Sequence, residues 1–269
     1  MSKTVISNMM TEVLNETYTY LDSCYEGDDI EFLKTKLLAL SGVKSFGFTL
    51  IPGKHLSYEN LQELLSTLNE RESIRKSKGV YYTPHDVVQF ILYNSIKQVY
   101  GKLGTNGLHV MDLNGIPYRS FCMSKTVFDP TCGAGEFLLE ALNTKFDLLD
   151  NHVEKITEGM VKNIIVTIFG NDINPESTAI TKIRLFLCAL KRYGLKRCLT
   201  IDSLLNKNFY NKDFISKVPK FGRKFDLIIG NPPYVEDAKS GLDLDRKFGN
   251  IYANELSNSA QLLNENGVF

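Results

Sequence analysis

Apolar residues recur at helical spacing through the first quarter of the chain, over residues 9–25, 30–40 and 58–75. Each of these segments has an apolar stripe along one face and is predicted to form an amphipathic helix. The stretch between the second and third segments is short and interrupted by glycine, and no element is predicted there. We therefore expect residues 1–74 to form an N-terminal helical region, either a cap on the rest of the chain or the remnant of a fused module.

Beyond this region the pattern changes, because short apolar segments now alternate with longer segments of helical spacing. A continuous apolar, β-branched run such as 163–170 is typical of a strand buried on both faces. Strands are predicted over 126–128, 163–170, 198–203 and 226–230, and helices over 85–100, 137–146 and 175–193. This alternation predicts an α/β fold, a parallel sheet with helices on both faces, in a catalytic domain that spans residues 75–269.

Polar residues stand at the ends of the predicted strands. Asp129, Asp172 and Asp202 end the first three strands, and Asn231 ends the fourth. The carboxyl ends of parallel strands lie along one edge of a sheet, and ligands bind there in open sheets of this kind. An acid after the second strand, here Asp172, is the usual residue that binds a ribose diol. We therefore expect a single site along this edge.

The loop after the first predicted strand is rich in small residues. Gly133 and Gly135 allow a tight turn and a close approach of a ligand to the backbone. The loop matches neither the glycine pattern of dinucleotide sites nor the lysine-bearing loop of nucleoside triphosphate sites. Taken alone, it is also compatible with an ordinary turn between a strand and a helix.

The segment Asn231–Tyr234 supplies candidate chemistry for an amine substrate. The exocyclic amine of a purine has a delocalised lone pair and is a weak nucleophile. The side-chain oxygen of Asn231 and the carbonyl of Pro232 can accept hydrogen bonds from such an amine, and Pro233 helps to stiffen the loop. Tyr234 offers a flat ring on which a base can stack. The competing interpretation is a strand that ends in a proline-rich turn.

Together these segments resemble the N6-adenine DNA methyltransferases of restriction–modification systems, which use S-adenosylmethionine. Asp129–Gly135 resembles their first cofactor motif, and Asn231–Tyr234 resembles their catalytic motif. Gly79–Pro84 resembles the segment that packs over the methionine end of the cofactor in this family. The order, with the cofactor motif before the catalytic motif, is that of one class of the family. The resemblance implies a Rossmann-like methyltransferase sheet.

The resemblance also implies a cofactor, partners and site residues. The cofactor is S-adenosyl-L-methionine, and the substrate is double-stranded DNA, from which the target adenine must be flipped out. A restriction or specificity subunit is a candidate partner, and the expected location is the cytoplasm. The implied catalytic residues are Asn231, Pro232, Pro233 and Tyr234; the implied cofactor-binding residues are Tyr82, Thr83, Pro84, Asp129, Thr131, Gly133, Gly135, Asp172, Ile173, Asp202 and Asn231.

Two alternatives remain open from the sequence. The same tetrapeptide also occurs in enzymes that methylate RNA bases or a glutamine side chain in a protein, so it does not identify the substrate alone. The loop at Asp129–Gly133 and the segment Tyr82–Pro84 favour DNA by resemblance. The second alternative is a non-catalytic fragment or subunit that binds only a cofactor or a partner.

Composition restricts the class of protein without identifying it. The 269 residues, 43% of them hydrophobic, are enough for one full α/β core and a small accessory unit. The five cysteines form no C-x-x-C pair, which fits reduced thiols better than a disulfide framework. The four histidines are scattered, so no metal site is predicted, and no apolar run reaches the ~20 residues of a membrane span. The formal net charge of +0 is unusual for a protein that holds DNA unaided.

The last residues suggest an incomplete domain. A helix is predicted after Tyr252 and a turn at Asn264–Gly267, followed by a strand that begins at Val268. We expect the chain to be a C-terminally truncated fragment without a target-recognition domain, and the strand at 226–230 to have an unpaired edge. The segment 100–125 is interpreted as a hairpin-like insertion.

Overall fold

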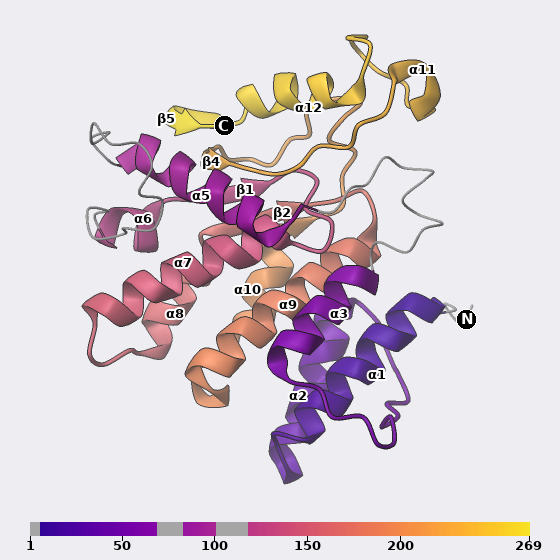
Figure 1. Ribbon diagram of the computed structural model, residues 1–269, viewed down its shortest axis with the longest axis vertical. Coiled ribbons are helices and arrows are strands. Elements are labelled where there is room, and N and C mark those ends of the chain that lie inside the picture. The colour runs from indigo at the N-terminus through magenta and orange to yellow at the C-terminus, as the bar shows by residue number, and fades with distance from the viewer. Residues whose placement is uncertain (1–5, 69–82, 101–117) are drawn as a thin grey trace.

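The computed structural model describes residues 6–68, 83–100 and 118–269 (Figure 1). Predictions for Tyr82, for residues 69–75 and for most of the 100–125 segment lie outside these ranges. The helices are α1 (Asn8–Asp22), α2 (Gly27–Ser41), α3 (Tyr58–Leu68), α5 (His85–Tyr100), α6 (Tyr118–Ser124), α7 (Glu136–His152), α8 (Glu158–Ile165), α9 (Pro175–Tyr193), α10 (Ile201–Asn208), α11 (Asp237–Ser240) and α12 (Ile251–Ala260), with a 3-10 turn η2 (Leu195–Arg197). The strands are β1 (Val127–Asp129), β2 (Ile168–Asn171), β3 (Phe209–Tyr210), β4 (Phe225–Ile228) and β5 (Leu263–Val268).

The five strands form one parallel sheet in the order β3-β2-β1-β4-β5. Residue Phe128 of β1 stands beside Phe169 of β2 and Ile228 of β4, so the three central strands end at the same level. The strand order reverses direction between β1 and β4, which is the place where open α/β sheets bind ligands. The predicted fold class, a parallel α/β sheet flanked by helices, is confirmed.

The two faces of the sheet bury different side chains, because successive residues of a strand point to opposite sides. Val127, Ile168 and Leu227 join the main hydrophobic core together with the helices. On the other face, Phe128 and Phe225 stack with their ring centroids 4.2 Å apart, inside a mainly aromatic cluster that also contains Phe169, Phe214 and Leu262. Phe225 lies on this face, although it is two residues from Leu227, because the pairing of β4 is irregular between them. The second face is therefore covered by the segment after β3 and by the end of α12.

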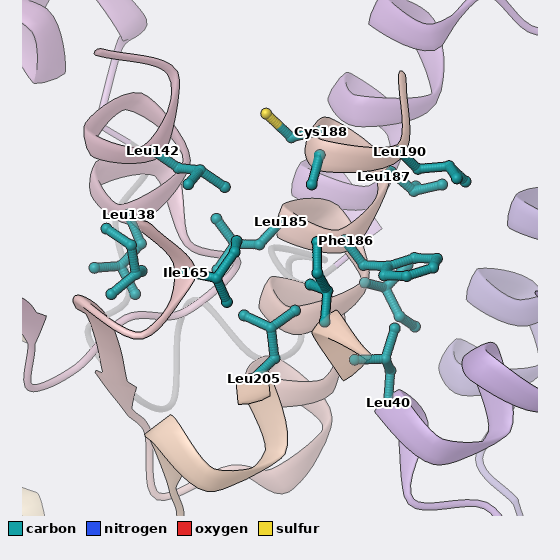
Figure 2. Packing of buried hydrophobic residues seen from close by; sticks show 14 of the residues in the cluster. Leu40, Leu138, Leu142, Ile165, Leu185, Phe186, Leu187, Cys188, Leu190 and Leu205 are labelled. Atoms are coloured by element: carbon teal, nitrogen blue, oxygen red, sulfur yellow. The ribbon is translucent and has the colours of Figure 1, made fainter. Parts of the chain in front are cut away.

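Helix α9 connects the sheet layer to the N-terminal helices. Figure 2 shows side chains of α9 packed between Leu138 of α7, Leu205 of α10 and Leu40 of α2. The N-terminal helices α1–α3 lie at the opposite end of the molecule from α12 and β5 (Figure 1). They nevertheless share the main core, since their buried leucines belong to the same cluster as those of α9.

The prediction for α9 is confirmed at both ends because its local signals are strong. Asn174 caps the helix by accepting a hydrogen bond from the backbone of Glu176 at 3.1 Å, and Pro175 occupies the first turn. The helix ends at Tyr193, before Gly194. The predictions for α1, α2 and α5 are also confirmed within about three residues at each end, whereas α7 begins as predicted and continues six residues beyond its predicted end.

Two strand predictions were wrong in part or in full. The run 163–170 begins as the end of α8, which is capped by Thr157, and only its last residues enter β2. The run 198–203 contains no strand, because Ile201 and Leu205 bury one face of α10 against the core. The third strand is the later and shorter β3. Short apolar runs do not distinguish a buried helix from a buried strand.

The predicted unpaired edge of the fourth strand was also wrong. Strand β4 pairs in parallel with β5, with Phe225 opposite Leu263 and Leu227 opposite Val268. The predicted turn at 264–267 lies inside β5, as an irregularity in which Asn266 has a φ of 64°. In the segment 100–125 the last part, α6, is helical and not a hairpin.

Candidate active site

Two backbone N–H groups of the loop after β1 anchor it, one to its own strand and one to β2. The backbone N–H of Thr131 donates to Oδ1 of Asp129 at 3.1 Å, and the N–H of Cys132 donates to the carbonyl of Asn171 at 2.8 Å. Gly133 and Gly135 have φ values of 51° and 86°, a left-handed region that favours glycine. A side chain on Gly135 would also collide with Thr181 of α9. The two glycines predicted for a close backbone approach are therefore required by the turn itself.

The N-terminal helices hold the same loop from the outside. Arg184 of α9 is buried and donates at 2.6 Å both to the carbonyl of Ala134 and to Glu136. From α3, Gln62 accepts a hydrogen bond from Arg184 at 2.9 Å, and Ser66 donates to Glu136 at 2.5 Å. The buried charge of Arg184 is paired with the carboxylate of Glu136, and the guanidinium also donates to two neutral oxygens. Sequence reasoning missed this group, since its members are up to 122 residues apart.

Asp172 lies beside the loop, as predicted for an acid after the second strand. One carboxylate oxygen accepts a hydrogen bond from the backbone of Gly133 at 3.0 Å, and the other accepts from that of Asn174 at 2.8 Å. The following residue, Ile173, is 59% exposed although it is large and apolar. The structure thus brings together the carboxylate, the glycine loop and an uncovered apolar side chain.

The predicted catalytic segment contacts Thr83 of the predicted Tyr82–Pro84 segment. The side-chain nitrogen of Asn231 donates to Oγ1 of Thr83 at 3.1 Å, although the two residues are 148 positions apart. Gly230 approaches the first acid so closely that a Cβ placed on it would lie 2.6 Å from Oδ1 of Asp129. Pro84 follows Thr83 on the surface, where α5 begins. Three of the predicted motifs therefore converge on one edge of the sheet.

The three residues after Asn231 are partly exposed to solvent. Pro232 and Pro233 are half-buried, and Tyr234 is 49% exposed. The ring of Tyr234 lies 5.8 Å from the ring of Tyr252 on α12, at an interplanar angle of 43°. Two partly exposed aromatic rings thus stand next to Asn231, which suits a planar ligand.

Asp202 does not belong to this edge, so its assignment to the cofactor site was wrong. It lies in the first turn of α10, is buried, and forms an ion pair with Lys36 of α2 at 3.0 Å. The acid nearest the end of the true third strand is Asp213, whose Oδ1 accepts from the backbone of Ile215 and Ser216 at 3.1 and 3.0 Å. The error follows from the misplaced strand at 198–203.

Sequence reasoning also missed Glu255, which α12 brings to the loop. Its side chain is 2% exposed, and the hydroxyl of Thr131 lies 3.3 and 3.2 Å from its two carboxyl oxygens. The signal that could have identified it is an acid on the buried face of the helix, between Ile251 and Asn258.

The electrostatics of this edge are unusual, because acids are crowded and buried. Burial raises the pKa of Asp129 to about 8, helped by the charge of Asp172 and opposed by the hydrogen bond from Thr131. Burial likewise raises the pKa of Glu255 to about 8, and both aspartates add to the effect. Acids that burial keeps largely protonated can ionise to balance a ligand that carries positive charge.

Among the described residues, no three His, Cys, Asp or Glu side chains are grouped closely enough to hold a metal ion. The crowded acids are thus not arranged as a metal centre. In the same ranges, no helix has the length and apolar character that crossing a bilayer requires.

Comparison with known families agrees with this geometry. Residues 167–269 match the Eco57I restriction-modification methylase family. The matched part contains Asp172, the segment Asn231–Tyr234 and Glu255. The resemblance inferred from the motifs is thereby confirmed.

Two curated relatives are similar over longer stretches. The adenine-specific methyltransferase PglX of Streptomyces coelicolor is 28% identical over 200 residues, which cover 61% of this chain and 15% of PglX. The type II methyltransferase M.VspI of a Vibrio species is 24% identical over 195 residues, which cover 72% of this chain and 34% of M.VspI. The match thus spans 15% of the length of PglX and 34% of the length of M.VspI.

The fold also has a solved counterpart. A DrdV–DNA complex superposes with a TM-score of 0.52 at 14% identity, over 79% of this chain and 23% of the DrdV chain. At this level of identity the likeness supports the fold and not the activity.

Proposed function

We propose that this chain is the catalytic part of an adenine-specific DNA methyltransferase of a restriction–modification system. It transfers a methyl group from S-adenosylmethionine to the N6 amine of adenine. The observation that carries the proposal is the 3.1 Å hydrogen bond from Asn231 to Thr83, beside the loop of Asp129 and Asp172. This hydrogen bond joins the amine-binding segment to Thr83, and the preceding residue, Gly230, lies against Asp129 at the start of the cofactor-type loop.

The residues at this edge fit S-adenosylmethionine by their chemistry. The carboxylate of Asp172 suits the two ribose hydroxyls, and the exposed side chain of Ile173 suits the apolar face of an adenine ring. The left-handed turn at Gly133 is held by hydrogen bonds to Asp172 and Thr181, which fixes the loop in a conformation that a ligand can approach without meeting a side chain at this position. The buried acids suit a cation. The cofactor, when bound, supplies the activated methyl group.

Asn231 and Pro232 receive the amine of the target base in this proposal. Thr83 engages the amide nitrogen of Asn231, which fixes the plane of the amide and leaves its oxygen as the acceptor suited to the amine. The carbonyl of Pro232 provides the second acceptor. These groups are held in place before the reaction, so they can stabilise the nitrogen as it gains positive charge without reorganising.

The adjoining aromatic rings provide a place for a flipped base. In duplex DNA the target amine is stacked inside the helix, and extruding it costs a few kcal/mol. Tyr234 presents a ring that is half exposed, and Tyr252 stands beside it. Stacking on such a ring is worth about 1–3 kcal/mol per base, enough to offset much of that cost.

We also propose the partners, the location and the domain division of the protein. Double-stranded DNA is the proposed partner, a restriction or specificity subunit is a second one, and the cytoplasm is the proposed location. The division into residues 1–74 and 75–269 is retained, with the N-terminal helices supporting the cofactor loop through Gln62 and Ser66.

The test is a methyl-transfer assay with radiolabelled S-adenosylmethionine on three substrates: DNA, RNA and a glutamine-containing peptide. We expect label in DNA, recovered as N6-methyladenine after digestion. Label in RNA or peptide alone would replace DNA with one of the alternative substrates. Binding of S-adenosylmethionine without transfer to any substrate would leave the non-catalytic alternative.

A further inference from the structure

Thr131 connects two buried acids that come from distant parts of the chain. Its backbone N–H donates to Asp129 at 3.1 Å, and its hydroxyl lies within 3.3 Å of both carboxyl oxygens of Glu255, 124 residues away. Glu255 belongs to α12, whereas the other acids of this edge follow β1 and β2. A third element therefore contributes a carboxyl group to the proposed cofactor loop.

The surroundings of Glu255 make its charge state responsive to a ligand. The titratable groups that act on it are Asp129, the last residue of β1 before the loop, and Asp172, directly after β2; both are acidic. Cys132 in the same loop contributes no charge, because burial raises the pKa of its thiol well above the ordinary value. With a pKa of about 8, the Glu255 carboxyl is largely protonated near neutral pH in the absence of a ligand.

We propose that Glu255 is a specificity-determining residue of this site, a carboxyl group that ionises when the sulfonium cofactor binds and stays protonated with the neutral demethylated product. This inference rests on the proposed function. S-adenosylmethionine carries one more positive charge, on its sulfur, than S-adenosylhomocysteine. A buried carboxyl group distinguishes them by charge, although their shapes differ by a single methyl group.

The sign of the effect follows from linkage. A nearby cation favours the carboxylate and so lowers the pKa of Glu255 in the complex. Binding of S-adenosylmethionine then releases a proton from Glu255 to the buffer, and its affinity rises with pH until about 8, where the unliganded group is already ionised. The product S-adenosylhomocysteine lacks the sulfonium charge, so fewer protons are released per molecule bound. The site thus favours exchange of spent product for fresh cofactor.

The test is isothermal titration calorimetry of both ligands in two buffers of different ionisation enthalpy, which gives the number of protons released. The wild-type chain is compared with Glu255→Gln, which keeps the size and hydrogen-bonding ability of the side chain but removes the charge. Glu16→Gln is the matched control, because Glu16 is a buried acid that pairs with Lys54 in the N-terminal region.

We expect the wild type to release more protons with S-adenosylmethionine than with S-adenosylhomocysteine near pH 7, and the control to behave like it. In Glu255→Gln the difference in proton release falls, with Asp129 as the remaining acid of raised pKa, and the preference for S-adenosylmethionine falls about tenfold, as for loss of one partly screened charge pair. Equal proton release with both ligands in the wild type would overturn the inference without any variant. So would a folded Glu255→Gln protein with unchanged release and preference. If the wild type bound neither ligand, the proposed function itself would fail.

Discussion

Aspartates at the amino and carboxyl ends of the central strands have pKa values shifted in opposite directions. At the amino end, Asp226 accepts hydrogen bonds at 2.9 Å from both the backbone and the hydroxyl of Thr126, and it pairs with Lys125 at 3.3 Å. Burial alone would raise the pKa of Asp226, but these partners lower it below the ordinary value. At the carboxyl end, Asp129 has a pKa raised to about 8 by burial, beside a second acid.

Lys145 also has several hydrogen-bond partners at the amino end, although burial lowers its pKa to about 7. It is fully buried, yet its ammonium donates to the carbonyls of Phe121 and Lys125 at 2.9 and 2.7 Å and to the hydroxyl of Thr167 at 2.8 Å. It thereby ties α7 to α6 and to the starts of β1 and β2. The amino end is a scaffold in which each of these charges has partners, and the carboxyl end carries crowded acids that a cationic ligand would balance.

The largest effect should come from the chemical site. Asn231→Ala removes a preorganised acceptor for the amine and should lower the rate of methyl transfer to DNA by about 100- to 1000-fold. Binding of S-adenosylmethionine should change little. Single-turnover transfer and calorimetric titration of the same preparation separate the two effects. Substantial turnover by Asn231→Ala would place the amine elsewhere.

The next effect should appear at the opposite end, in stability. Lys145→Met keeps the length of the side chain but leaves carbonyl groups of α6 without a donor, and should reduce the free energy of unfolding by about 3 kcal/mol. Urea unfolding measures this loss. Cofactor affinity, measured below the unfolding transition, should stay within about twofold. A stability equal to that of the wild type would show that the network around Lys145 contributes nothing.

Two matched aspartates sharpen the comparison further. Asp172→Asn keeps the shape of the side chain but loses its charge, and should weaken S-adenosylmethionine binding about 30-fold, or about 2 kcal/mol. Asp226→Asn should leave affinity unchanged and instead lower the free energy of unfolding by about 1–2 kcal/mol. Calorimetric titration gives the affinity, and urea unfolding gives the free energy of unfolding, of each variant. A loss of affinity in Asp226→Asn with a loss of stability alone in Asp172→Asn would contradict the distinction between the two ends.

The smallest effect should be a change in how steeply the free energy of unfolding depends on pH. Because the pKa of Asp129 is raised to about 8, the folded state holds a proton that the unfolded state has lost. The stability that this proton provides is complete below the unfolded pKa and is lost as the pH rises to about 8. Asp226 behaves oppositely, since its lowered pKa gives stability that is lost only in acid. Asp129→Asn should flatten the decline of the unfolding free energy of the ligand-free protein between about pH 4 and pH 8, and an unchanged decline would exclude burial of Asp129 as its cause.

The sequence predicted those parts of the fold and site that depend on local signals. Capping and spacing located α9, and the glycine loop, Asp172 and Asn231 reached the expected edge. Asp202 did not, because its partner Lys36 is 166 residues away and the apolar run around it forms a helix. Packing on neighbouring elements decides such short runs, and no local pattern records it.

The missed residues share the same cause. Glu255 and Thr131 meet only because α12 covers the end of β1, and Gln62 reaches Arg184 only because α3 packs on α9. Motifs identify residues whose neighbours in sequence are also part of the site. Supporting residues that are isolated in sequence require the tertiary structure.

The most direct test of the contrast between the two ends is amide hydrogen exchange with and without S-adenosylmethionine. The account predicts that added protection concentrates at the carboxyl edge, in residues 131–135, 172–174 and 230–234. The amides near Thr126 and Asp226 should exchange as they do in the ligand-free protein. Protection confined to the amino end, or saturating cofactor without any change at the carboxyl edge, would contradict the placement of the cofactor site.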